Sequence, residues 1–176
     1  MSFAIWPFIS DLRTGSFSGG SGEEALIVAA AVQIGKFYDL PTTVPSCMTD
    51  SKIPDAQAGY EKGISAILAG LAGGNRILES AGMLGSLMGC SFEALVIDND
   101  MLGSVQRVIR GIEVTEETLS VKEIKEVALG EGHFLGHKQT LEHMQTEFLY
   151  PKLADRTSPG EWEENGSKDI FYRAHE

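Results

Sequence analysis

Four short apolar segments of the chain run directly into polar residues. They are residues 3–9, 42–44, 76–78 and 92–97, and each is followed by charged or hydroxyl side chains. Short apolar runs that alternate with helical patterns are typical of parallel strands in βα units. We therefore predict four parallel strands whose carboxyl ends meet at one edge, where folds of this type build their functional sites.

Helical periodicity separates these segments. Ser21 and Glu24 have capping-box spacing at the start of one predicted helix, Asp55 begins a second that Gly73 ends, and Asp98 is the predicted N-cap of the helix after the fourth strand. Residues 81–90 are small and apolar, which predicts a covering loop that lines a pocket. The positions expected to be buried are Leu26, Ala29, Ala30, Ile34 and Phe37 in the first helix, and Tyr60, Ile64, Ile67, Leu68 and Leu71 in the second.

From residue 112 onward the periodicity is helical only. One helix is expected between Ser120 and Gly130, another over residues 141–149, and a short one near Trp162. The predicted fold is therefore α/β. Residues 1–111 form four βα units, the parallel-strand half of a (β/α)8 TIM barrel, and residues 112–176 form a C-terminal helical extension that packs on it. A complete barrel takes about 250 residues, so we expect a missing N-terminal half or a second copy to complete it.

Composition narrows the class of partner. The chain has 176 residues, 43% of them apolar, and a formal net charge of −11. This charge opposes nucleic-acid binding. The sequence has neither an apolar run of about 20 residues nor the pattern of a secretory signal, so we expect no membrane association and a cytoplasmic location. Cys47 and Cys90 fall near opposite edges of the predicted sheet and are expected to be free thiols.

Candidate catalytic residues lie at the predicted strand ends. Asp50 and Lys52 follow the second strand and Asp11 follows the first, so these three are the predicted catalytic group. Asp55 and Gln57 are interpreted as capping and surface residues. The loop 19–22 leads into a helix, where backbone amides can bind phosphate, but it lacks the Lys-Ser/Thr of a P-loop and is interpreted as a flexible connection.

No metal site is predicted. The Asp98-Asn99-Asp100 run is better explained by a helix cap than by cation ligands. His133, His137 and His143 lack the glutamate that follows the first histidine of a zinc helix, and glycines interrupt the segment.

Several motifs in order along the chain resemble a known family. The Thr49-Asp50-Ser51-Lys52 stretch with Asp55-x-Gln57-x-Gly59-x-Glu61 is the most specific of them. The full set is similar to the trimethylamine:corrinoid methyltransferase family, and the other motifs are Asp11-x-Arg13-Thr14-Gly15, Val96-Ile97-Asp98, Gly132-His133-Phe134-Leu135, and Tyr150-Pro151 through Asp155-Arg156 to Trp162.

The resemblance implies a (β/α) barrel of which this chain matches the C-terminal part. It also implies transfer of a methyl group from a methylated amine to the Co(I) of a separate corrinoid protein. The chain contains no non-standard residue and so resembles the members without pyrrolysine, some of which act on glycine betaine or related quaternary amines. No cofactor would then be bound directly, because the cobalamin is carried by the corrinoid partner. The half barrel alone is expected to be inactive unless its open edges are covered.

Such a reaction requires a site that holds a cation and aims one methyl group. Asp11, Asp50 and Glu79 are expected to neutralise the cation. Aromatic faces add cation–π contact, and basic groups hold any carboxylate end of the substrate; the candidates are Trp6, Phe17 and Tyr60 for the first role and Arg13, Lys52 and His133 for the second.

Two alternatives remain open. The loop 19–22 would suit a TIM-barrel enzyme that acts on a phosphorylated metabolite. Unpaired strand edges would suit a non-catalytic fragment that pairs with a second copy.

Overall fold

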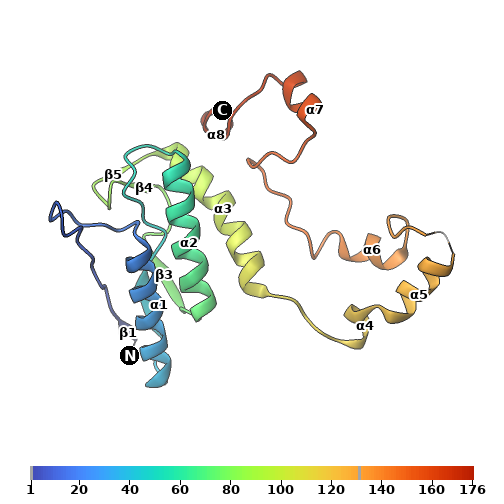
Figure 1. The fold of residues 1–176 in the computed structure, drawn as a ribbon, viewed down its shortest axis with the longest axis horizontal. Helices are drawn as coiled ribbons and strands as arrows, with labels where there is room; N and C mark the ends of the chain where they lie inside the picture. The colour runs from blue at the N-terminus through green and yellow to red at the C-terminus, as the bar shows by residue number, and fades with distance from the viewer. Residues whose placement is uncertain (1, 131) are drawn as a thin grey trace. The chain divides into compact units, whose positions relative to one another are not determined.

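Three short parallel strands form the main sheet of the protein. The structure is a computed structural model, and it describes residues 2–130 and 132–176. The strands are β1 (Phe3–Ala4), β2 (Thr42–Pro45) and β3 (Arg76–Leu78), in the order β1-β2-β3 (Figure 1). Both pairings are parallel. The first three predicted strands are therefore confirmed in position and direction, although β1 ends well before the predicted residue 9.

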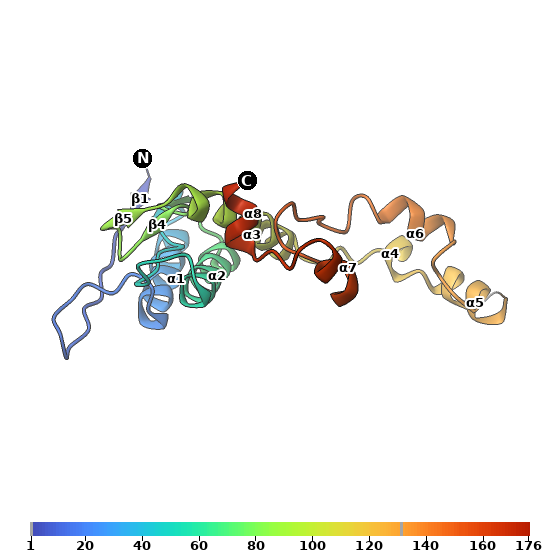
Figure 2. The same ribbon diagram turned by 90° about the horizontal axis from the view of Figure 1, so that it is seen from above.

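Two helices connect the strands, α1 (Gly22–Phe37) and α2 (Ala56–Ala72), and they lie side by side (Figures 1 and 2). Their ends are set by the predicted residues. The Ser21 side chain accepts the N–H of Glu24, the Asp55 side chain accepts the N–H of Ala58, and Gly73 ends α2 with φ +89°. Left-handed backbone of this kind favours glycine, which explains the stop.

The core between these helices and the sheet is built from small side chains. Val28 and Val32 of α1 pack with Val44 of β2 and Ala69 of α2. Helix and sheet approach closely, since a Cβ at Gly35 would overlap the side chain of Thr42. The predicted buried stripes were largely wrong, because their large apolar members point outward; Leu26, Ile34, Phe37, Tyr60, Ile64 and Leu71 are exposed and Ala29 is buried.

The predicted fourth strand was wrong. Residues 92–97 open the long helix α3 (Phe92–Arg110), and the Ser91 hydroxyl accepts the N–H of Ala94 at its start. A six-residue apolar run fits either state, and burial at Ala94 and Val105 selects the helical one. Asp98 is consequently not an N-cap, since it lies inside α3 with its side chain buried.

A small hairpin occupies the segment predicted as a covering loop. Strands β4 (Met83–Leu84) and β5 (Gly89–Cys90) pair antiparallel, and the turn between them lies against the end of β2. Backbone amides of Gly85 and Ser86 donate to the carbonyls of Ser51 and Thr49, both at 2.7 Å. The predicted role of lining a pocket is confirmed below, although the segment is a hairpin and not an irregular loop.

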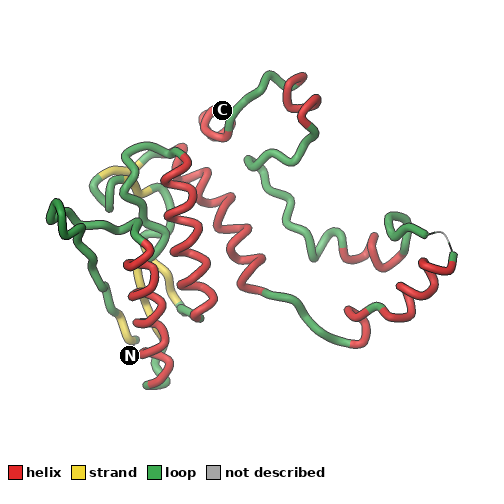
Figure 3. The backbone as a smooth tube through the Cα atoms, in the orientation of Figure 1, coloured by secondary structure: helices red, strands yellow, loops and turns green. Residues whose placement is uncertain are grey.

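The remaining helices are short, and loops make up much of the segment that carries them (Figure 3). The chain divides into two compact units, Arg110–Tyr150 and the remainder. The helices of the first are α4 (Glu116–Leu119), α5 (Val121–Leu129) and α6 (Lys138–His143), and those of the C-terminal segment are α7 (Pro159–Glu164) and α8 (Ile170–His175). Helix α6 ends six residues before the predicted limit. Within the described residues, no helix combines the length and apolar character needed to cross a membrane.

The C-terminal segment is anchored to α3. The Asp100 carboxylate accepts the backbone N–H groups of Lys152 and Ala154 at 2.8 and 3.1 Å. Nδ1 of His175 in α8 lies 2.9 Å from Oε1 of Glu93, in the first turn of α3. The structure is thus a mixed α/β fold, while completion of a TIM barrel stays a prediction.

Candidate functional site

The segment that leaves β2 is buried and partly strained. Residues 46–49 and Ser51 are almost inaccessible, and Cys47 adopts φ +65°. Glu79 after β3 and Ser86 in the hairpin turn also have positive φ. Non-glycine residues in this region cost free energy and concentrate where a structure serves function. The carboxyl edge of the sheet therefore has the properties expected of a site.

Asp50 is the centre of this edge. Its carboxylate accepts the hydroxyls of Ser18 and Ser86, together with the backbone N–H groups of Gly19 and Gly20 at 2.9 and 3.3 Å. Burial by itself would raise the pKa of Asp50, but these hydrogen bonds to the ionised form hold it below its ordinary value. Asp50 is therefore a fixed anion, with a single orientation set by donors from two segments, the loop 18–20 and the hairpin turn.

Glu61 of α2 holds the backbone behind Asp50. Its buried carboxylate accepts the Thr49 hydroxyl at 2.5 Å, the Asp50 N–H at 2.8 Å and the Gln57 side-chain amide at 2.9 Å. Gln57 and Glu61 are four residues apart, so they lie on one face of α2. Gln57 thus belongs to a hydrogen-bonded network, beyond the surface role predicted for it.

Gly20 is required where the loop passes this network, which gives a first prediction. A Cβ at Gly20 would overlap the Glu61 carboxylate and lie 2.8 Å from the Asp50 nitrogen, whereas a Cβ at Gly22 meets nothing within 4 Å. We expect Gly20→Ala to lower the free energy of unfolding by about 1–3 kcal/mol. Urea unfolding of Gly20→Ala and Gly22→Ala measures this difference. Equal stability of the two variants would show that the loop has room to spare.

The other predicted catalytic residues lie beside Asp50. The Lys52 ammonium donates to the Asp50 backbone carbonyl at 2.6 Å. The Arg13 guanidinium binds Asp11 in bidentate fashion, at 3.0 and 2.6 Å. The hydrogen bond from Arg13 lowers the pKa of Asp11 to about 2. Asp11 is thus also an anion, but one already paired with a cation.

A cleft of about 600 Å³ brings these residues together. Phe17 supplies an aromatic wall and Met88 a thioether. The ring of Phe17 packs edge-to-face with the ring of Phe8, and the two ring centroids are 5.1 Å apart. The lining also takes in hydroxyls and the hairpin turn; its members are Asp11, Thr14, Ser16, Phe17, Ser18, Asp50, Lys52, Gly85, Ser86 and Met88. A neighbouring cleft of about 710 Å³ shares Asp11, Ser18 and Asp50 and adds Arg13, Glu23 and Glu61.

The other predicted substrate-binding residues are not among those that line either cleft. Glu79 is half-buried after β3, and Tyr60 lies on the exposed face of α2. Trp6 follows β1 and is partly exposed. His133 belongs to the unit Arg110–Tyr150 and is exposed there. The structure therefore groups Asp11, Arg13, Phe17, Asp50 and Lys52, and leaves the other four apart from them.

The glycine loop is poorly arranged for phosphate. The N–H groups of Gly19 and Gly20 are directed to the Asp50 carboxylate, so the loop presents them to an anion of the protein itself. Asp98, discussed above as a possible cation ligand, is paired with the buried ammonium of Lys62 at 2.5 Å. Across residues 2–130 and 132–176, no group of three His, Cys, Asp or Glu side chains is placed to hold a metal ion.

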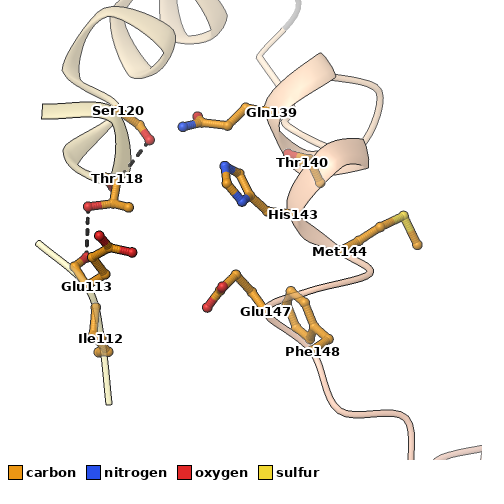
Figure 4. Close-up of a pocket in the computed structure, with 10 residues that line it drawn as sticks. All are labelled: Ile112, Glu113, Thr118, Ser120, Gln139, Thr140, His143, Met144, Glu147 and Phe148. Atoms are coloured by element: carbon orange, nitrogen blue, oxygen red, sulfur yellow. Dashed lines mark hydrogen bonds between the residues drawn. The ribbon is translucent and has the colours of Figure 1, made fainter. Parts of the chain in front are cut away.

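A separate cleft, of about 450 Å³, lies inside the unit Arg110–Tyr150. Gln139 and His143 point toward the opposite wall, where the Thr118 hydroxyl donates to the Glu113 carbonyl at 2.8 Å (Figure 4). None of the strand-end residues reaches it. We therefore locate the candidate site at Asp50.

Three residues of the site region were missed by sequence reasoning. Ser18 and Ser86 carry the hydroxyls that bind Asp50, and each lies in a loop of small residues that gave no specific signal. Glu24 was assigned to a helix cap, yet its side chain is buried. Only its position at a helix start beside the glycine loop could have drawn attention to it.

Comparisons with known proteins agree with the motifs. A family model described as trimethylamine methyltransferase (MTTB) matches residues 2–176. The trimethylamine methyltransferase MttB of Methanosarcina thermophila is 46% identical over 166 residues, which cover 94% of this chain and 34% of that protein. The MttB protein of Desulfitobacterium hafniense (strain DSM 10664 / DCB-2) is 36% identical over 96% of this chain and 33% of its own length.

A relative with a different named substrate is also similar. The glycine betaine methyltransferase of Desulfitobacterium hafniense (strain Y51) is 37% identical over 154 residues, or 88% of this chain and 32% of that protein. The chain thus spans about one third of the length of the relatives it matches.

Proposed function

Because the chain belongs to the trimethylamine methyltransferase family, we propose that it takes part in moving a methyl group from a methylated amine to the Co(I) of a corrinoid protein. The amine is trimethylamine-like, or a quaternary amine such as glycine betaine, and the names of the relatives support both. We further propose that the three βα strands belong to a (β/α)8 barrel, completed by a further half or a second copy.

The arrangement around Asp50 is the observation that carries this proposal. A quaternary ammonium group has no N–H to donate, so a protein recognises it by charge and by contact with aromatic or other polarisable groups. The cleft offers the ionised Asp50, the ring of Phe17 and the thioether of Met88. Among the residues that the structure describes, no cationic side chain neutralises Asp50, since its donors are hydroxyls and backbone amides and Lys52 is directed to its carbonyl.

The chain's part in the reaction is positioning. The corrinoid supplies the nucleophilic metal, and the protein holds the cation so that one methyl group faces out of the cleft. Asp50 would fix the charged nitrogen, and Arg13 or Lys52 would hold a carboxylate end if the substrate has one. No residue of the cleft needs to donate a proton for the tertiary amine to leave a quaternary substrate.

Methylation of a Co(I) corrinoid protein tests the proposal. The completed barrel, in which the chain is joined by the further half or second copy that the proposal requires, is mixed with the Co(I) partner and with trimethylamine, glycine betaine, tetramethylammonium or methylamine, and the loss of Co(I) absorbance is followed. We expect the absorbance to fall with at least one tertiary or quaternary amine. No change with any amine, in a protein that is folded by circular dichroism, would contradict the proposed activity.

A further inference from the structure

Glu24 is a buried acid without a hydrogen-bond partner. Its side chain lies in the first turn of α1 with only 1% of the residue exposed. Neither carboxyl oxygen has a hydrogen bond among the residues that the structure describes. An isolated buried carboxylate is costly, and such a group retains its proton instead. Glu24 therefore differs from Asp50 and Glu61, whose oxygens are satisfied by several donors.

The charges around Glu24 favour the neutral acid. The pKa of Glu24 is raised to about 7: burial raises it most, the backbone amide of Ile9 lowers it, and the negative charge of Asp50 raises it. The neighbouring cleft also carries Glu23 from α1 itself, Glu61 from α2, and Asp11 with its partner Arg13 from the N-terminal loop. The field from these elements is negative overall, since Arg13 is already paired with Asp11.

We propose that Glu24 is the proton-holding residue of the cation site, which stays a carboxylic acid while the cleft is empty and releases its proton when a permanent cation binds beside Asp50. This inference rests on the proposed function. It adds a residue that senses the charge of the occupant without lining the cleft.

Glu24 would release its proton because the positive charge of the ligand cancels the electrostatic field of Asp50. A cation against Asp50 offsets the negative charge that helps Glu24 to keep its proton. Ionised Glu24 then adds a second negative charge behind the ligand. A neutral molecule of the same shape offsets nothing and leaves the proton in place. Glu24 thereby strengthens discrimination between permanent cations and neutral compounds.

The sign of the pH dependence follows from this exchange. Below pH 7 the free protein must lose a proton to gain the extra attraction, so cation binding is weakened there. Above pH 8 Glu24 is already ionised and the dependence ends. If the bound cation lowers the pKa of Glu24 from about 7 by about one unit, the Kd falls about fivefold between pH 6 and pH 8, and about tenfold only over a wider pH range.

Calorimetric titration with tetramethylammonium tests the proposal. We expect the Kd to fall about fivefold between pH 6 and pH 8, and a release of about half a proton per ligand between pH 6 and pH 7, obtained from titrations in phosphate and in Tris. The variant Glu24→Gln keeps the shape of the neutral acid. It should bind within about twofold of the wild type at pH 6, bind about ninefold more weakly at pH 8, and release no proton.

Matched controls separate this effect from general electrostatics. Glu164→Gln removes an exposed charge from α7 and should leave the pH profile unchanged. tert-Butanol, a neutral ligand of similar shape, should release no proton. Should Glu24→Gln fail to fold, difference infrared spectra of the wild type still report the carboxylic-acid band, which should disappear when the cation is added.

The outcomes distinguish the inference from the function beneath it. Cation binding that is independent of pH, or that keeps the same pH profile in Glu24→Gln, would overturn the role of Glu24 and leave the cation site standing. Absence of tetramethylammonium binding at every pH would overturn the cation site itself, and the inference with it.

Discussion

Lys62→Met is expected to lower the free energy of unfolding by about 3–5 kcal/mol, the range found when one member of a buried ion pair is removed. The Lys62 ammonium of α2 lies 2.5 Å from the Asp98 carboxylate of α3, and both side chains are almost fully buried. The variant leaves the Asp98 charge in the interior with the Gly82 N–H, at 2.7 Å, as its remaining hydrogen bond among those described. Urea unfolding at pH 7 measures the loss.

A double variant isolates the cause. Lys62→Met with Asp98→Leu removes both charges and fills the space with apolar atoms, so most of the lost stability should return. Lys138→Met, which breaks an exposed pair with Glu142, should change stability little. A double variant that is no more stable than Lys62→Met alone would show that packing, and not the stranded charge, explains the loss.

Local sequence signals predicted the elements that depend on neighbouring residues. The caps at Ser21 and Asp55 and the stop at Gly73 are set by hydrogen bonds and dihedral angles within a few residues. They also positioned two parallel crossovers correctly. The run 92–97 failed, because its apolar character suits a strand and a helix equally and only packing against the rest of the chain decides.

The buried face of each helix could not be read from hydrophobicity. Close approach between α1 and the sheet requires small residues such as Ala25 and Gly35, so the larger apolar side chains face away. Charged residues are rarely buried, so Glu24 was assigned to a helix cap and Lys62 was given no role. Their burial depends on contacts with segments distant in sequence, which periodicity does not contain.

Part of the candidate site was predicted because parallel strands end at one edge. Asp11, Asp50 and Lys52 met in one cleft for that reason. Glu79 also follows a strand, yet it is not among the cleft residues, because the β4-β5 hairpin places Ser86 and Met88 there. A strand end therefore predicts the edge on which a side chain lies, while the loops decide whether it reaches the cleft.

Asp50→Asn is expected to lower kcat/KM for a quaternary amine by about 100-fold. Two unit charges roughly 5 Å apart interact by about 3 kcal/mol at an effective dielectric constant near 20, and asparagine loses this attraction while keeping the size of the side chain. The surrounding donors include two hydroxyls that can reorient, so the fold should be affected less than the activity. Methylation of the Co(I) corrinoid protein gives the rate, and thermal unfolding gives the stability.

Asp39→Asn provides the matched control, since it removes the same charge from an exposed residue just beyond the carboxyl end of α1, where asparagine tolerates the φ of +52°. Its activity should equal that of the wild type, because screening by salt removes the influence of a distant exposed charge. The fall in kcat/KM of Asp50→Asn should appear with cationic amines. The substitution should not change the weak binding of a neutral isostere such as tert-butanol. Wild-type turnover by a folded Asp50→Asn protein would exclude Asp50 from the site. The other carboxylate that lines the cleft, Asp11, is already bound by Arg13, so it could not replace the lost charge.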